Sequence, residues 1–331
     1  MSVDVNGLHV WIGSRPIVRD VNMHIADGER VGLVGASGSG KSMIAKTLLG
    51  LLPFDARCKG KVQLGQTQII GACERTLADL RGRYVGAVFQ NPAAALNPVL
   101  PVVRQIELPL KLHYDLSAAE RESRAMAMLH KVGLDDTTAR AYPHQLSGGQ
   151  QQRVGIATAL VTSPRFIIAD EPTTALDSIT QRQIVDLLVS LVDDAGASML
   201  FITHDFAVLA RATSRAYVLD GGAIVESGDT SALLTHPEHK QTRALVRSAC
   251  ALTLHAGTVT DMGTVADTGT VVDGATATDD NADACPASYG AADGVAESAA
   301  SDGAISSVAA SDVADAGGVL GIEEGDVHER A

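Results

Sequence analysis

A glycine-rich segment of eight residues constrains the fold of this chain more than any other feature. It consists of Gly35, Ala36, Ser37, Gly38, Ser39, Gly40, Lys41 and Ser42, and fits the pattern G-x-x-x-x-G-K-S. The glycines let the backbone curl so that consecutive N–H groups point at phosphate oxygens, while Lys41 reaches the β and γ phosphates and the Ser42 hydroxyl ligates Mg²⁺. An apolar run at 30–34 precedes the segment and a helical stretch at 41–52 follows it. The sequence therefore predicts a strand, a phosphate-binding loop and a helix in that order.

The remainder of the first 250 residues alternates between apolar strand candidates and amphipathic helices. The strand candidates are YVGAVF (84–89), FIIAD (166–170) and MLFIT (199–203), and residues 179–192 place their apolar side chains on one helical face. YVLD and AIVESG, on either side of Gly221-Gly222, predict a β-hairpin. This alternation predicts an α/β fold with a mostly parallel sheet that is covered on both faces.

Residues 93–160 differ from the rest because they lack good strand signals. Ser117 and Glu120 form a capping-box pattern, and the apolar stripe of the following helix ends at Gly133. We therefore predict a helical insertion in the α/β core.

The charge of the chain is unevenly placed. The net charge is −13, but residues 251–331 hold 15 Asp and Glu and a single Arg, so residues 1–250 carry a net charge of +1. From about residue 252 the composition is dominated by Ala, Gly, Thr, Ser, Asp and Val, which predicts a disordered acidic tail, with a small extra domain as the alternative. A nearly neutral body argues against a nucleic-acid partner.

The sequence also gives expectations about the compartment. No window approaches ~18 uninterrupted apolar residues, which argues against a transmembrane helix. The N-terminus has Asp4 and no basic stretch, which argues against a secretory signal. The four cysteines are widely spaced without a CxxC pattern, as suits a reduced cytoplasm.

Several polar residues follow the predicted strands. Asp170 and Glu171 end the strand at 166–170, where the first can hold the Mg²⁺ shell and the second can orient or deprotonate a water. Gln90 follows YVGAVF and His204 follows MLFIT, so both are expected at the carboxyl edge of the sheet, where ligands bind in open α/β folds. Each of these residues taken alone is typical of an ordinary strand end or loop, and the phosphate loop in the same chain favours the functional interpretation.

A further segment is Leu146-Ser147-Gly148-Gly149-Gln150. Ser147 is a good N-cap, the two glycines allow close backbone approach, and the helix that follows could bind an anion at its N-terminus or be an ordinary capped helix. Asp177 is expected to cap the helix that begins near Ile179.

Taken in order, these motifs resemble the nucleotide-binding subunits of ABC transporters, over about residues 3–250. FQNPAAALNPV (89–99), YPHQLSGGQQQRV (142–154), ADEPTTALD (169–177) and HPEHKQTRAL (236–245) look like the ATPases of peptide and nickel importers. The resemblance implies a P-loop NTPase core over residues 1–250 with an N-terminal antiparallel β subdomain, a helical subdomain at about 93–160, and a tail at 251–331.

The resemblance also implies roles for single residues. Residues 35–42 match the Walker A loop, Asp170 the Walker B aspartate and Glu171 the catalytic glutamate. Gln90 matches the glutamine that senses Mg²⁺ and the transmembrane subunit, and His204 matches the switch histidine near the γ-phosphate.

Three further matches concern the contact between subunits and the adenine of ATP. The signature motif, which completes the site of the opposite subunit, is matched by Ser147, Gly148, Gly149 and Gln150. Asp177 matches the aspartate of the dimer contact. Trp11 is placed about where the family has an aromatic that stacks on adenine, although it could simply belong to the core.

The function that the resemblance implies is ATP binding and hydrolysis in a solute importer, with ATP and Mg²⁺ as cofactors. The expected partners are a second ATPase subunit (a copy or a paralogue), transmembrane permease subunits and, indirectly, an extracellular solute-binding protein. The expected place is the cytoplasmic face of the cell membrane. Di- and oligopeptides are the expected solutes. Nickel or another small solute is the alternative, because the body ends near 250 without a cysteine-containing extension.

Two other classes compete with an importer subunit. A soluble ABC ATPase acting on DNA or ribosomes is disfavoured by the single cassette and the neutral body. A regulatory module without turnover is disfavoured by the presence of both Glu171 and His204.

Overall fold

A computed structural model describes residues 2–174 and 176–257, and these residues all lie in one compact unit. The strands are β1 (Val3–Ile12), β2 (Arg15–Ile25), β3 (Arg30–Val34), β4 (Ala56–Leu64), β5 (Thr67–Gln68), β6 (Val85–Val88), β7 (Phe166–Asp170), β8 (Ser198–Thr203), β9 (Arg215–Asp220) and β10 (Ala223–Asp229). The helices are α1 (Lys41–Leu48), α2 (Glu74–Leu80), α3 (Pro92–Ala95), α4 (Val102–His113), α5 (Ala118–Lys131), α6 (Asp136–Arg140), the 3₁₀ turn η1 (Pro143–Gln145), α7 (Gly148–Leu160), α8 (Ser178–Asp194), α9 (Phe206–Ala212), α10 (Thr230–Thr235) and α11 (Lys240–Gly257).

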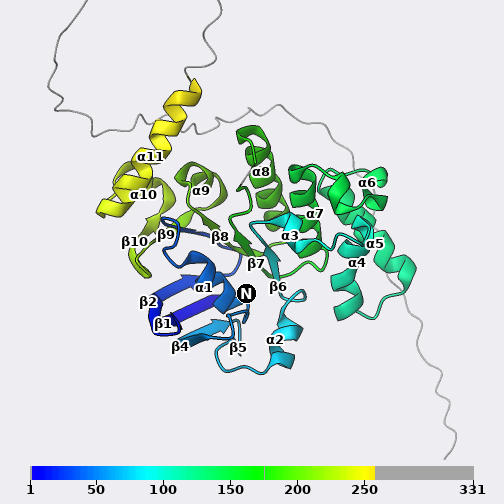
Figure 1. Ribbon diagram of the computed structural model, residues 1–331, viewed down its shortest axis with the longest axis horizontal. Coiled ribbons are helices and arrows are strands. Elements are labelled where there is room, and N and C mark those ends of the chain that lie inside the picture. Colours follow the sequence, from blue (N-terminus) through cyan, green and yellow to red (C-terminus); the bar gives the residue numbers. More distant parts are fainter. Residues whose placement is uncertain (1, 175, 258–331) are drawn as a thin grey trace, which may run out of the picture. The chain divides into compact units, whose positions relative to one another are not determined.

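The strands of the described residues form two sheets (Figure 1). The N-terminal sheet has the order β2-β1-β4-β5 and is antiparallel throughout. The larger sheet has the order β10-β9-β3-β8-β7-β6, and only the β9–β10 hairpin in it is antiparallel. The predicted mostly parallel sheet, the N-terminal antiparallel sheet and the hairpin across Gly221-Gly222 are therefore confirmed.

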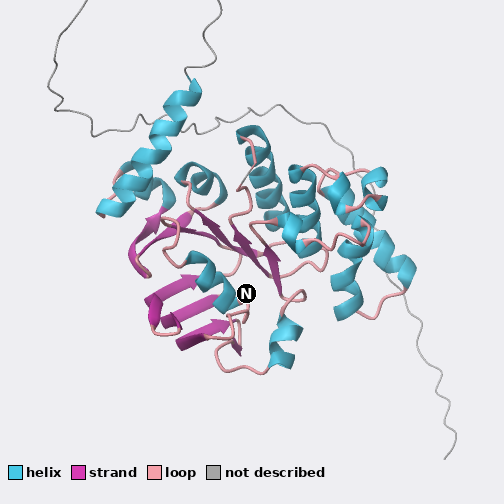
Figure 2. Cartoon of the chain, viewed as in Figure 1, coloured by secondary structure: helices cyan, strands magenta, loops and turns pink. Residues whose placement is uncertain are grey.

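Strands β3, β7, β8 and β9 of the larger sheet are buried on both faces, as their uninterrupted apolar residues predict. Along β7, Ile167 and Ala169 pack in a core with α7, α8 and α9, while Phe166 and Ile168 pack in a second core with α1 and the antiparallel sheet. Figure 2 shows the strands of this sheet, in magenta, between these two layers. The side-chain alternation of each strand thus assigns α1 and α7 to opposite faces.

The segment between β6 and β7 is helical, as predicted, and holds α3 to α7 and η1. The predicted capping box at the start of α5 is present. There the Glu120 N–H donates to Ser117 Oγ at 3.2 Å, and the Ser117 N–H donates to Glu120 Oε2 at 2.8 Å. The predicted end of that helix is also present, since Gly133 follows it in the left-handed region, with φ +73°.

The last described helix, α11, crosses the predicted boundary between body and tail at residue 250, because ALTL at 251–254 consists mainly of good helix formers. Its start is fixed by Glu226 of β10, which accepts the N–H groups of Glu238 and His239 at 2.9 and 3.0 Å. Residues 258–331, which contain most of the predicted acidic tail, lie outside the described residues. In the described part of the chain, no helix combines the length and the apolar character needed to cross a membrane.

Arg215 of β9 joins the two sheets. Its guanidinium donates to both carboxylate oxygens of Glu29 at 2.8 and 3.0 Å, to the Tyr217 hydroxyl at 2.7 Å and to the carbonyl of His24, at the end of β2, at 2.7 Å. These bonds from Arg215 hold the pKa of Glu29 below its ordinary value of 4.5, against the effect of burial. One cation thus ties the end of β2 in the antiparallel sheet to β9 and to the start of β3 in the larger sheet.

We predict that Arg215→Met lowers the free energy of unfolding by about 2 kcal/mol at pH 7, since hydrogen bonds to charged groups are removed and Glu29 is left unpaired. Because the pKa of Glu29 is lowered in the folded state, its stabilisation is complete above the unfolded pKa and is lost as pH falls through the folded pKa. Urea unfolding at several pH values should therefore show a parent–variant difference that shrinks below pH 4.5.

Arg211→Met is the matched control. It removes an ion pair with Asp186 in which both side chains are half exposed, so the expected loss is small. This account would be contradicted if both variants lost the same free energy of unfolding. It would also be contradicted if the loss for Arg215→Met did not depend on pH.

Candidate functional site

The phosphate loop joins β3 to α1 and lies against two other strands. A Cβ at Gly35 would stand 2.2 Å from the carbonyl oxygen of Leu219 in β9, and one at Gly40 would stand 3.0 Å from that of Ile17 in β2. Gly38 and Gly40 also have φ values of +78° and +110°, which favour glycine. Glycine is needed at Gly38 and Gly40 because of their positive φ values, and at Gly35 and Gly40 because a Cβ there would lie too close to a backbone oxygen.

Lys41 stands at the first position of α1 and is only 5% exposed. Its ammonium donates to the carbonyls of Gly35 and Ala36 at 2.8 and 3.0 Å, so it lies across the loop. Burial lowers the pKa of Lys41, while Glu171 and Asp170 act in the opposite direction. The amine is therefore a desolvated charge that gains from an anionic ligand.

The loop also holds a buried hydroxyl. Ser39 is 5% exposed, and its Oγ has no hydrogen-bond partner among the described residues. A buried polar group without a partner is costly unless a ligand or water satisfies it. Together with Lys41 and the N-terminus of α1, this donor fits a bound phosphate.

Asp170 ends β7 beside the loop, as predicted. Its Oδ1 accepts the Ser42 hydroxyl at 3.2 Å. Burial, with Glu171 adding to it, raises the pKa of Asp170 above its ordinary value, although Ser42 and Lys41 oppose the rise. A hydroxyl beside a half-buried carboxylate is a donor set suited to Mg²⁺, which is usually bound through one or two protein oxygens together with substrate phosphates. No group of three or more His, Cys, Asp or Glu side chains suited to a metal occurs in the described ranges.

Glu171 is the point at which separate segments meet. The side chain of Glu171 is 14% exposed. Gln90 Nε2 donates a hydrogen bond to Glu171 Oε2 at 2.9 Å, and His204 Nδ1 lies 3.4 Å from Glu171 Oε1. The backbone of Glu171 has φ +47°, a conformation that costs on the order of 1–3 kcal/mol for a residue with a side chain. The N–H of Glu171 donates a hydrogen bond to the Ile202 carbonyl at 2.9 Å. The structure thus brings Gln90, Glu171 and His204 together, as the strand ends predict.

Thr174 belongs to the same cluster and was missed in the sequence. Its hydroxyl donates to Glu171 Oε2 at 3.0 Å. The signal that could have found it is the proline after Glu171, because proline favours the second position of a four-residue turn.

The segment Ser147–Gln150 begins α7 as a capped helix. The Gln150 N–H donates to Ser147 Oγ at 3.3 Å, and the Ser147 N–H donates to Gln150 Oε1 at 3.0 Å. A Cβ at Gly149 would stand 2.9 Å from Thr180 Cγ2, so this glycine lets α7 begin against the start of α8. That start is capped by Asp177, as predicted, which accepts the N–H groups of Ile179 and Thr180 at 3.1 and 3.0 Å.

The chain does not place this segment on its own phosphate loop. In Figure 1, α7 and α1 lie on opposite sides of the parallel sheet, in the two separate cores. Within the described residues, no hydrogen bond links Ser147–Gln150 to residues 35–42. Ser147, Gly148 and Asp177 are instead exposed, on a surface open to another molecule.

Trp11 lies in β1, where it pairs with Pro16 of β2. Its ring stacks on that of His9, with centroids 5.5 Å apart. Val10, between them, is buried in the core that contains α1, so His9 and Trp11 lie on the other face of the antiparallel sheet. Contact of Trp11 with adenine stays a prediction.

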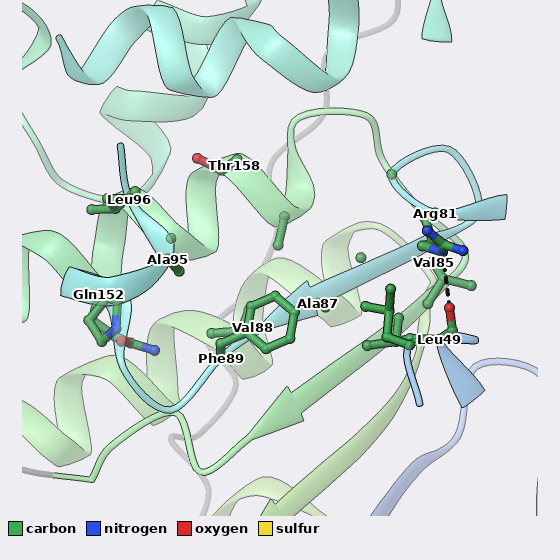
Figure 3. Close-up of a pocket in the computed structure, with 16 residues that line it drawn as sticks. Leu49, Arg81, Val85, Ala87, Val88, Phe89, Ala95, Leu96, Gln152 and Thr158 are labelled. Carbon is green, nitrogen blue, oxygen red and sulfur yellow. Dashed lines mark hydrogen bonds between the residues drawn. The ribbon is translucent and has the colours of Figure 1, made fainter. Parts of the chain in front are cut away.

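A groove runs along β6, the edge strand of the larger sheet (Figure 3). It has a volume of about 330 Å³ and ends next to Gln90, because Phe89 is among its lining residues. The lining is mainly apolar and comes from β6, from the segments around Leu49 and Ala95, and from α7. Leu51 and Phe89 are 42% and 44% exposed there, and Gln152 of α7 buries an amide nitrogen without a partner among the described residues.

Known proteins resemble the chain over most of its body. The family described as ABC transporter matches residues 18–174. A putative peptide import ATP-binding protein of Brucella abortus (strain 2308) is 40% identical over 78% of this chain and 80% of its own length. The oligopeptide transport ATP-binding protein OppD of Lactococcus lactis subsp. cremoris (strain SK11) is 39% identical over 70% of this chain and 69% of its own. The peptidoglycan transport ATP-binding protein YejF of Agrobacterium fabrum (strain C58 / ATCC 33970) is 43% identical over 69% of this chain, which spans 43% of that protein.

A solved structure shares the fold. The ATP-binding cassette MJ0796, in a dimeric post-hydrolysis state bound to ADP and Pi, is 34% identical and covers 69% of this chain and 98% of its own, with a TM-score of 0.62. The chain therefore belongs to the ABC transporter family, as one of its ATP-binding, ATP-hydrolysing subunits. The predicted family and fold class are confirmed.

We predict that Gly35→Ala destabilises the chain by about 2–3 kcal/mol, since its Cβ meets a backbone oxygen that cannot move aside. For a body of this size that is a fall in Tm of roughly 5–10 °C. Thermal melting without nucleotide measures it.

Gly38→Ala is the matched control, because a Cβ there meets nothing within 4 Å and only the positive φ opposes it. If Gly35→Ala kept the Tm of the parent, or if Gly38→Ala lowered the Tm more than Gly35→Ala, the close packing at Gly35 would not be important for stability.

Proposed function

We propose that this chain hydrolyses ATP at the carboxyl edge of its parallel sheet and so drives a peptide importer. The observation that carries the proposal is the placement of Glu171, a little-exposed carboxylate in contact with Gln90 and 3.4 Å from His204, directly after the Asp170 that meets the phosphate loop. This set combines a base, an amide and an imidazole with an anion-binding loop.

In this proposal the N–H groups of residues 35–42 and the Lys41 ammonium bind the β and γ phosphates of ATP. Ser42 and Asp170 would hold Mg²⁺, with Gln90 beside them, and the bound ion would supply positive charge that neutralises the phosphates. Lys41 already lies over the loop carbonyls, so it needs only a small side-chain movement to meet a phosphate.

Hydrolysis uses the strand ends. Glu171 accepts a proton from a water, whose oxygen attacks the γ-phosphorus in line with the bond to the β,γ-bridging oxygen. That bond breaks, and ADP leaves with the bridging oxygen. His204, which is 55% exposed, is free to turn toward the γ-phosphate and stabilise its charge.

We predict that Glu171→Gln keeps nucleotide affinity and loses at least about a hundredfold in kcat, because the glutamine preserves shape and removes the base. Lys41→Ala should instead lose ATP binding. Nucleotide titration and phosphate release measure the two effects. Turnover at the parent rate in Glu171→Gln would overturn the assignment of the base, and parent affinity in Lys41→Ala would overturn that of the loop.

We propose further that two subunits complete each other's sites. This is supported by the exposed start of α7, which stands on the face of the sheet away from its own phosphate loop. A second subunit, a copy or a paralogue, would bring its Ser147–Gln150 segment to the ATP held by residues 35–42, with Asp177 at the contact.

Ser147→Arg tests the dimer. It puts bulk where the γ-phosphate should dock and should abolish the ATP-dependent dimer of Glu171→Gln chains, or of a chain with its paralogue, while ATP binding to the single subunit persists. Light scattering with Mg·ATP measures the change.

Ser117→Arg is the matched control, because it removes an equivalent capping box on α5. Dimerisation that survives Ser147→Arg, or is lost equally in Ser117→Arg, would contradict the proposal.

The permease partner is proposed to dock in the β6 groove. An apolar cavity of about 330 Å³ has room for side chains of a short helix. Its lining includes Phe89, the residue before Gln90, so an occupant could bias the contact of Gln90 with Glu171. Docking there would hold the subunit at the cytoplasmic face of the membrane. We propose residues 1–250 as the ATPase domain, with the helical subdomain at about 93–160.

Peptides are the solute class that the relatives support. The Brucella and Lactococcus proteins carry names of peptide and oligopeptide transport, and their similarity extends well beyond the nucleotide-binding motifs.

A further inference from the structure

A tight turn follows the proposed catalytic base. Its sequence is Glu171-Pro172-Thr173-Thr174, and the Thr174 N–H donates to the Glu171 carbonyl at 3.3 Å. Proline at the second position restricts φ to the value that such a turn requires. The turn brings its fourth residue back beside its first, and this is why the hydroxyl of Thr174 reaches the carboxylate of Glu171.

The two oxygens of that carboxylate are held unequally. Oε2 accepts two hydrogen bonds, from Gln90 Nε2 at 2.9 Å and from Thr174 Oγ1 at 3.0 Å. Among the residues that the structure describes, the only partner recorded for Oε1 is His204 Nδ1, at 3.4 Å, which is longer than an ordinary N–H···O hydrogen bond. The side chain is 14% exposed, so little water is available to even out this difference.

We infer that Thr174 is a positioning residue for hydrolysis: its hydroxyl fixes Oε2 of Glu171 and leaves Oε1 as the oxygen that takes the proton from the attacking water. The inference rests on the proposed function, in which Glu171 is the base. In the step, a water O–H bond breaks and its proton goes to Oε1. The water oxygen bonds to the γ-phosphorus, and the bond to the β,γ-bridging oxygen breaks to release ADP.

The neighbouring threonine supplies a control within the same turn. Thr173 is 5% exposed, and its hydroxyl accepts Gln181 Nε2 of α8 at 3.2 Å instead of meeting Glu171. Removing either hydroxyl therefore deletes one hydrogen bond of a turn threonine, but only Thr174 acts on the carboxylate.

The test compares steady-state kinetics of Mg·ATP hydrolysis by the full chain. Thr174→Val, which keeps the shape without the hydroxyl, is expected to lower kcat about tenfold with KM for ATP within about twofold of the parent. Thr174→Ala, which adds no bulk, should match it. Thr174→Ser should restore most of kcat, because it restores the donor, and Thr173→Val should stay near the parent.

The inference is overturned if Thr174→Val and Thr174→Ala keep the parent kcat, if Thr174→Ser is as slow as they are, or if Thr173→Val loses as much. A rise in KM with kcat unchanged also overturns it, because that would place Thr174 in substrate binding. Failure of the proposed function is distinguishable: it appears as a parent chain without turnover, or as Glu171→Gln turning over at the parent rate.

Discussion

The site depends on one geometric constraint, the parallel arrangement of β3, β6, β7 and β8. The carboxyl ends of parallel strands all lie at the same edge of the sheet. The phosphate loop leaves β3 there, Gln90 comes shortly after β6, Asp170 and Glu171 lie at the end of β7, and His204 follows β8. The contacts at Glu171 join segments far apart in the chain, and they exist because the sheet holds these strands in register.

Burial of the central strands of that sheet on both faces explains why the phosphate loop and the capped start of α7 lie apart in one chain. Each buried strand sends alternate side chains into separate cores, so α1 and α7 are fixed on opposite faces. The phosphate loop therefore lies beside α1, whereas the capped start of α7 lies on the other side of the sheet. The proposed second subunit would unite them, and the β6 groove is the proposed docking place of the membrane partner.

The sequence predicts the local chemistry of this fold well, because caps, glycine loops and strand ends depend on neighbours in the chain. The phosphate loop, the capping box of Ser117 and Glu120, and the strand-end positions of Gln90 and His204 were all predictable in this way. Contacts that depend on three-dimensional packing were not. The face on which Trp11 lies follows from sheet register, and the β6 groove from the approach of α7 to an edge strand.

The central claim is that ATP lies on residues 35–42 with its γ-phosphate facing Glu171 and a signature segment from another subunit. A crystal structure of the parent chain with Mg²⁺ and a non-hydrolysable ATP analogue tests it most directly. The account predicts a water within hydrogen-bond distance, about 3 Å, of Glu171 Oε1 and in line with the γ-phosphorus. It also predicts a second subunit's Ser147–Gln150, from a copy or a paralogue, against the same phosphate. A nucleotide bound away from the loop, or a γ-phosphate that no second subunit approaches, would contradict it.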